Sequence, residues 1–168
     1  MHAHRFAAWT LPWLLAAAPA WALEAPLAAD AHISSTAPTS NFGSAATINV
    51  GGGSTALLRF DLGTLPAGTT ASKLVKATLV LYINRLGTPG AVDVQTVYSD
   101  WFEPSVRGNA APALGGPGNA ITVALPNAGQ YIAVDVTAQA KQWISNPGTN
   151  FGLALTPALT TPNTVVFF

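Results

Sequence analysis

The sequence lacks cysteine and carries little charge. None of its 168 residues is Cys, and charged residues make up only 8% of the chain. Without Cys the protein can form no disulfide framework, no thiolate zinc site and no Cys nucleophile. Seven basic and seven acidic residues give a formal net charge of zero, and a neutral chain has no general electrostatic attraction to nucleic acid or anionic lipid. We therefore expect no nucleic-acid partner.

The groups that catalysis needs are scarce as well. A Ser-His-acid triad requires a His general base, yet beyond the first few residues the sequence contains only His32, and no G-x-S-x-G motif is present. Asp100 and Glu103 form a pair of carboxylates beside Trp101 that resembles a sugar subsite, although acids where a strand enters a loop are ordinary. A lyase or glycosidase is therefore the least favoured reading, and we predict a non-catalytic protein.

Residues 1–22 are predicted to be a secretory signal peptide. A short start containing His and Arg precedes an apolar run rich in Ala, Leu and Trp, and Ala20-Trp21-Ala22 is an A-x-A cleavage site. The apolar run is short for a membrane span, and Pro residues interrupt it. We therefore expect a mature domain of residues 23–168 that is periplasmic or extracellular and has no stable membrane insertion.

The rest of the sequence is typical of an all-β fold. Short runs rich in Val, Ile, Leu and Thr alternate with clusters of Gly, Pro, Asn and Ser, as in a sandwich or barrel. Residues 102–119 are rich in Pro, Gly and Asn, and we expect a surface loop there. The predicted strands are residues 30–35, 47–50, 55–62, 75–84, 91–98, 120–125, 131–135, 151–155 and 164–168.

Alternation predicts which faces of two strands point inward. The residues expected to face the core are Leu58, Phe60 and Leu62 in the third strand, and Ala77, Leu79, Leu81 and Ile83 in the fourth.

After residue 135 the spacing of the apolar residues changes from that of a strand to that of a helix. Val136, Ala140, Trp143 and Ile144 fall on one face of a short helix, which places Trp143 in the core. We expect Thr137 to be the N-cap and Asn146-Pro147-Gly148 to end the helix. The chain then ends in an apolar run, residues 165–168, where domains usually have polar residues. This ending predicts a domain that is incomplete at its C-terminus.

A series of motifs runs in order through the predicted mature domain. They are ADAHISS from residue 29, TSNFGSAATINVGGG from 39, ALLRFDLGTLPAGTT from 56, ATLVLYINRLGTPGAVDV from 77, Trp101 with Glu103, ITV at 121–123, VDVTAQAKQW at 134–143 and FGLAL at 151–155. Together they resemble carbohydrate-binding module family 96, also called the DNRLRE domain. The resemblance implies a secreted, jelly-roll-like β-sandwich, found beside polysaccharide-degrading enzymes and in large surface proteins. It also implies binding of polysaccharides, in some members acidic ones such as alginate.

The chain departs from this family pattern in two places. The family continues after its last strand with a polar Asp-Ser-Lys-Glu-like segment, whereas this chain stops at Phe168. The family also has a Thr-Trp-Asn-Asn-like stretch after the Trp-x-Glu, whereas residues 106–109 here contain no Trp. If that Trp shapes a binding surface, binding here is weaker or different. The resemblance carries over no individual binding residue.

Candidate binding residues follow from the chemistry of sugars. Aromatic rings stack on apolar sugar faces, and cations pair with acidic groups. Lys76 and Tyr82 share the outward face of one predicted strand, Arg85 follows just past Tyr82, Arg59 faces outward on its own strand, and Trp101 lies at a strand end. We take these five as candidate ligand-binding residues forming a shallow patch. The alternative is that they are ordinary sheet-surface residues.

A structural calcium ion is the candidate cofactor. Calcium binds Asp, Asn and backbone oxygens, and Asp30, Asn41 and Asp135 each begin or end an element. The alternative is that they are ordinary turn-forming Asn and Asp residues, which are common where no metal is bound.

These observations predict a jelly-roll-like antiparallel β-sandwich with one short helix near its C-terminus. We expect a secreted, non-catalytic module that binds a polysaccharide, with a catalytic domain outside this chain as a further partner. The alternative is a structural or adhesive module of the cell surface or extracellular matrix without specific sugar binding, which the low charge would suit.

Overall fold

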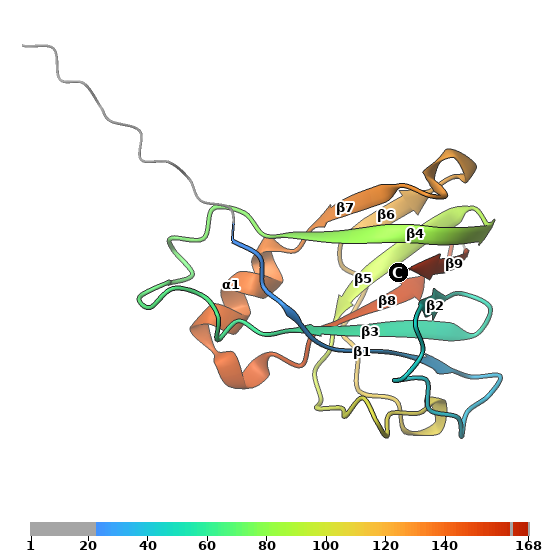
Figure 1. Ribbon diagram of the computed structural model, residues 1–168, viewed down its shortest axis with the longest axis horizontal. Helices are drawn as coiled ribbons and strands as arrows, with labels where there is room; N and C mark the ends of the chain where they lie inside the picture. The colour runs from blue at the N-terminus through green and yellow to red at the C-terminus, as the bar shows by residue number, and fades with distance from the viewer. Residues whose placement is uncertain (1–22, 162, 168) are drawn as a thin grey trace, which may run out of the picture.

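The computed structural model describes residues 23–161 and 163–167. Within them two antiparallel sheets pack face to face (Figure 1), one with strand order β1-β3-β8-β5-β6 and the other with order β2-β9-β4-β7. The predicted all-β, jelly-roll-like sandwich with one short helix is confirmed. The predicted signal peptide, residues 1–22, lies outside the described residues, as does Phe168. The strands are β1 (Leu27–Ser34), β2 (Ile48–Val50), β3 (Ser54–Phe60), β4 (Thr78–Thr88), β5 (Gly90–Thr96), β6 (Ala120–Val123), β7 (Tyr131–Asp135), β8 (Leu153–Pro157) and β9 (Thr164–Phe167).

The main core lies between the two sheets and follows the predicted alternation. Leu58 of β3 is buried there, and Phe60 packs against it. From β4 come Leu79, Leu81 and Ile83, and Phe167 of the neighbouring strand β9 lies in the same cluster. Local alternation was sufficient for these positions because each strand has one face toward the opposite sheet.

The outer face of the five-stranded sheet is buried as well. Leu57 points away from the main core yet is 0% exposed, because it joins a second apolar cluster with Ala31, Val97, Trp101 and Val106. The predicted surface loop supplies Val106, so this loop covers the sheet. Its abundant Gly and Pro predicted exposure, and Phe102 is indeed exposed, but Val106 is buried in this cluster and Leu114 packs against it.

The outer face of the four-stranded sheet remains open to solvent. Val80 and Asn84 of β4 are exposed there, as are Tyr131, Ala133 and Asp135 of the neighbouring β7. Among the described residues the sandwich therefore has one covered face and one bare face, and the bare face offers a sheet surface to a partner.

Helix α1 (Thr137–Ser145) closes one end of the sandwich, next to the loop that joins β3 and β4 (Figure 1). Val136 and Trp143 enter the main core, as predicted. The predicted N-cap is wrong by one residue, since Val136 occupies the cap and Thr137 is the first helical residue. The carboxylate of Asp135 accepts the backbone N–H of Thr137 at 2.8 Å and satisfies one free donor of the first turn. The 3-10 turns are η1 (Gly108–Ala110), η2 (Leu125–Asn127) and η3 (Pro147–Thr149).

Candidate functional site

The five candidate binding residues lie on two opposite faces of the sandwich. Arg59 and Trp101 belong to the covered face of the five-stranded sheet. Tyr82 and Arg85 belong to the bare face of the four-stranded sheet, and Lys76 precedes β4 at one end of that face. The single patch expected from the sequence is therefore divided between two surfaces.

The bare face carries a pair of tyrosines. Tyr82 of β4 and Tyr131 of β7 are direct cross-strand partners, and their ring centroids lie 5.1 Å apart at an interplanar angle of 59°. The Tyr131 side chain is 74% exposed and Tyr82 is half-buried. Sequence reasoning singled out Tyr82 but missed Tyr131, because the pairing of β4 with β7 joins segments that are far apart in the chain.

A β-bulge brings Arg85 to the same face. Ile83 pairs with Phe167, whereas Arg85 pairs with Val166, so β4 carries one residue more than β9 between these pairs. Strict alternation would point Arg85 inward with Ile83. The extra residue shifts the phase, and Arg85 is exposed beyond Tyr82.

Lys76 lies at the other end of the bare face. It is exposed, and its positive charge contributes to a lowered pKa of Asp135, although hydrogen bonds from Thr137 are the larger cause. At about 3.3 Å per residue, Lys76 stands roughly 20 Å along the chain from Tyr82. The tyrosine pair thus lies between two cations, with Arg85 much the nearer.

Trp101 is part of the covered face rather than an exposed platform. It is 6% exposed, and its indole N–H donates to the carbonyl of Phe151 at 2.8 Å. The guanidinium of Arg59 lies 5.3 Å from the ring centroid and also donates to the Asp100 carboxylate at 2.8 Å. Both residues are therefore engaged within the protein, and Trp101 presents no open ring face to a sugar.

Two of the three candidate metal ligands meet at Glu103. The Glu103 carboxylate accepts the backbone N–H of Asp30 at 3.1 Å. Burial raises the pKa of the Asp30 carboxyl, and the neighbouring Glu103 charge raises it further. The Asn41 amide donates to the carbonyls of Glu103 and Val106 at 2.7 and 2.9 Å. Asn41 therefore fixes the covering loop.

The third candidate, Asp135, is remote from the other two. It ends β7, an edge strand of the four-stranded sheet, whereas Asp30 lies in β1, an edge strand of the five-stranded sheet. Within residues 23–161 and 163–167, no three His, Asp or Glu side chains gather closely enough to share a metal ion. The three predicted ligands do not form one site.

The carboxylates of the candidate acidic pair also have separate partners. Asp100 is bonded to Arg59, and Glu103 receives the N–H of Asp30. Each acid thus helps to hold the covering loop against the five-stranded sheet.

The fold and its surfaces define a β-sandwich module with one open sheet face that bears aromatic and basic side chains. The model of carbohydrate-binding module family 96 matches residues 22–167, and the chain belongs to this family. Modules of this kind are generally non-catalytic. No curated protein matches the chain. No helix among the described residues has the length and apolarity needed to cross a bilayer.

Proposed function

We propose that this protein is a secreted, non-catalytic module that binds a polysaccharide on the open face of its four-stranded sheet. Membership of the carbohydrate-binding family supports sugar binding. The pairing of Tyr82 with Tyr131 is the observation that carries the choice of surface. The signal-peptide pattern of residues 1–22 supports export.

The tyrosine pair suits the chemistry of a polysaccharide chain. The apolar C–H faces of sugar rings pack against aromatic rings, and phenol hydroxyls can bond sugar hydroxyls. Tyr131 is largely exposed, whereas Tyr82 is held by its neighbours in the sheet. The rings therefore form a partly preorganised platform, and little side-chain entropy is lost on binding. An open face also allows a long chain to extend past the pair.

Arg85 extends the proposal to acidic polysaccharides. It lies exposed just beyond the tyrosines on the same face. A guanidinium can bind a carboxylate through two parallel hydrogen bonds. A uronic acid unit next to the stacked sugar would supply that carboxylate.

Affinity electrophoresis tests this function. The purified protein is run through gels containing alginate, pectin, xylan or no polysaccharide. We expect retardation in at least one gel. Tyr82→Ala and Tyr131→Ala should each weaken binding by about fivefold, since aromatic stacking contributes on the order of 1 kcal/mol.

Tyr98→Ala is the matched control. Tyr98 is 59% exposed but follows β5 of the five-stranded sheet. Its removal should leave migration unchanged. If the folded protein migrates identically in every gel, the structural or adhesive alternative replaces polysaccharide binding. If Tyr98→Ala abolishes retardation and the other two variants do not, the surface is misassigned.

A further inference from the structure

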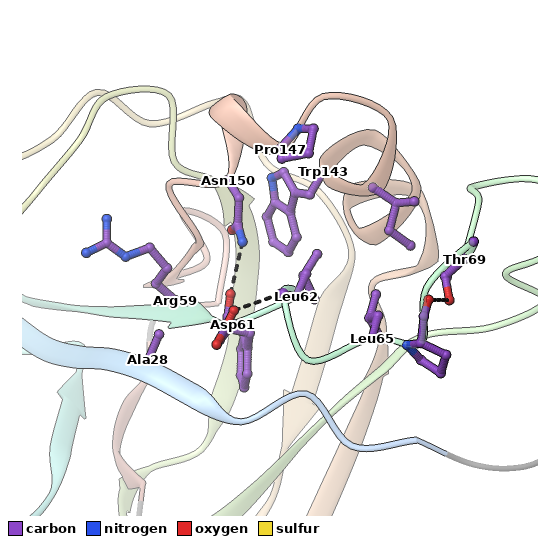
Figure 2. Close-up of a pocket in the computed structure, with 14 residues that line it drawn as sticks. Ala28, Arg59, Asp61, Leu62, Leu65, Thr69, Trp143, Pro147 and Asn150 are labelled. Carbon is purple, nitrogen blue, oxygen red and sulfur yellow. Dashed lines mark hydrogen bonds between the residues drawn. The ribbon is translucent and has the colours of Figure 1, made fainter.

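A groove of about 490 Å³ beside helix α1 uses its polar side chains to hold its own walls in place. The loop after β3 forms one wall, and α1 with the turn η3 forms the other (Figure 2). The Asn150 amide donates to the carbonyl of Phe60 at 2.9 Å, and the Asp61 carboxylate accepts the N–H of Gly63 at 2.8 Å. These side chains therefore brace the fold.

A smaller hollow of about 230 Å³ opens between the two sheets. Apolar side chains from both sheets line it, namely Leu58 and Phe60 of β3, Leu79 and Leu81 of β4, and Phe167 of β9. All five belong to the main core or pack against it. The hollow is thus an opening in the side of the main core.

The position of β9 explains where this hollow lies. β9 lies between β2 and β4, because Phe167 pairs with both Ile48 and Ile83. It runs beside only the second half of β4 (Figure 1). Beyond Phe167 the same line passes between residues 46–47, which precede β2, and residues 79–81 of β4, and both groups line the hollow. The hollow therefore occupies the place of a strand in the four-stranded sheet, and we call it the strand slot.

The backbone of β4 directs hydrogen-bonding groups into the strand slot. The carbonyl of Ala77 and the N–H of Ile83 are bonded at 3.0 Å to residues that flank β7. Successive residues of a strand send these groups to opposite sides, so the N–H and C=O groups of Thr78 and Val80 point away from β7. Within residues 23–161 and 163–167, no strand pairs with them on that side.

This edge of β4 lacks the features that usually prevent pairing with another chain. Edge strands are commonly protected by Pro, by charged side chains or by a bulge. Residues 78–81 have the sequence TLVL, and their pairing with β7 continues without a register shift. The first half of β4 can therefore accept a strand.

The walls of the strand slot restrict what can enter it. Residues 46–47 stand opposite β4, so there is room for one strand but not for the edge of a second folded sheet, which would bring its neighbouring strands with it. The charged residues of the lining, Glu24 and Asp30, are both acidic. The occupant that fits is a single extended segment with apolar side chains at alternate positions and basic side chains near its ends.

We propose that the strand slot binds such an extended peptide segment of another protein, which adds a strand to the four-stranded sheet. The segment runs antiparallel to β4, as β9 does. Its backbone bonds Thr78 and Val80, and its alternate apolar side chains enter the hollow, which is the usual division of roles when a peptide joins a sheet edge. This interaction is independent of sugar binding on the bare face.

Amide hydrogen exchange of the ¹⁵N-labelled full chain tests the proposal at single residues. The probe is the synthetic peptide KVTVTVK with blocked ends, whose valines share one face. We expect saturating peptide to slow exchange of the Val80 amide by at least tenfold, because the added strand bonds it. Ala133 is the internal control. It lies directly opposite Val80 in β7, but its N–H points to the outer edge of the sheet, and its exchange should not change.

Two altered peptides test the chemistry of the occupant. KVTPTVK has a central Pro, which lacks the N–H and disrupts the strand, and it should give no protection of Val80. EVTVTVE keeps the apolar face but reverses the charge at both ends. It should bind more weakly than KVTVTVK at low salt, and added salt should reduce the difference.

A pair of protein variants locates the binding edge. Val80→Pro removes a donor that faces the strand slot and keeps the bonds to β7, so it should weaken binding of KVTVTVK by about fivefold in calorimetry. Ala133→Pro removes a donor on the opposite edge of the same sheet and should bind like the original protein. If Val80→Pro does not fold, the comparison of KVTVTVK with KVTPTVK replaces it.

Three outcomes would overturn the proposal. The first is unchanged exchange of Val80 at saturating peptide, and the second is equal slowing at Ala133, which would show unselective pairing with any sheet edge. The third is protection of Val80 without peptide that rises with protein concentration together with a dimer in ultracentrifugation, which would make a second copy of this chain the occupant. Retardation in polysaccharide gels tests the tyrosine pair separately and would stand in each case.

Discussion

The guanidinium of Arg59 lies 5.3 Å from the centre of the Trp101 indole ring while it is bonded to Asp100 at 2.8 Å. The cation thus lies over one face of the ring, and the indole N–H is bonded to the carbonyl of Phe151. This arrangement ties the beginning of the covering loop to β3 and to the segment before β8. Trp101 therefore stabilises the domain rather than contacting a ligand.

Replacing Trp101 should lower stability without changing the binding surface. Trp101→Ala should reduce the free energy of unfolding by about 3–5 kcal/mol, the usual cost of removing a buried Trp side chain. Arg59→Ala should cost only about 1 kcal/mol, because an ion pair with an exposed partner and a cation–π contact each contribute little. Urea denaturation measures both changes.

Trp101→Phe keeps most of the ring and serves as the variant for binding assays. It loses the bond to Phe151 but should fold and be retarded in polysaccharide gels like the original protein. A selective loss of binding by a well-folded Trp101→Phe would show that the ring contacts sugar, against this assignment.

Local sequence patterns predicted the inward faces of β3 and β4. Leu58, Leu79 and Leu81 lie in the core as expected, because alternation requires no knowledge of the strand partners. The burial of Trp101 could not be predicted in this way. It depends on how the loop after β5 folds back over the five-stranded sheet. The local spacing of apolar residues does not indicate such a long-range contact.

The composition of the bare face depended on long-range pairing. Tyr131 joins Tyr82 because β7 pairs with β4, and Arg85 joins them because of a bulge against β9. Neither the partner strands nor the extra residue can be read from alternation within β4 alone. The sequence therefore identified residues of the candidate site but combined them with Arg59, which lies on the other face.

Arg85→Ala should weaken binding to acidic polysaccharide more than to neutral polysaccharide. An exposed ion pair contributes about 0.2–1 kcal/mol, so the expected loss for alginate is at most about fivefold. Affinity electrophoresis at low salt measures it, and 0.5 M salt should reduce the difference because exposed charges are screened.

Arg107→Ala is the control for this charge effect. Arg107 is also exposed but lies in the covering loop of the other sheet. The Arg107→Ala substitution removes the same charge and should leave alginate binding unchanged. Equal losses from both variants would mean that overall charge, and not the position of Arg85, determines the affinity.

Asn41→Ala should loosen the covering loop. Its amide donates to the carbonyls of Glu103 and Val106, and its oxygen accepts the N–H of Gly43 at 3.3 Å. Loss of the two donor bonds should cost about 1–3 kcal/mol and speed proteolysis within residues 102–110. Exposed Asn109→Ala is the control. Unchanged stability and proteolysis in Asn41→Ala would mean that water replaces these bonds without loss.

His32 makes stability depend on pH near neutrality. The side chain is 4% exposed, stacks on Phe42 with ring centroids 4.4 Å apart, and shares a 3.3 Å hydrogen bond with Asn49. Desolvation lowers the pKa of His32 below its ordinary value of 6.5. The folded protein therefore favours the neutral imidazole, whereas the unfolded chain protonates normally.

The sign of the pH effect follows from proton binding. As pH falls below about 6.5, the unfolded state takes up more protons at His32 than the folded state, so the free energy of unfolding decreases. We expect the melting temperature to fall between pH 7.5 and pH 5.5. Asp30, whose pKa is raised from 3.8, acts in the opposite direction and in a more acidic range. His32→Phe should flatten the profile; a decline that persists unchanged in this variant would assign it to another group.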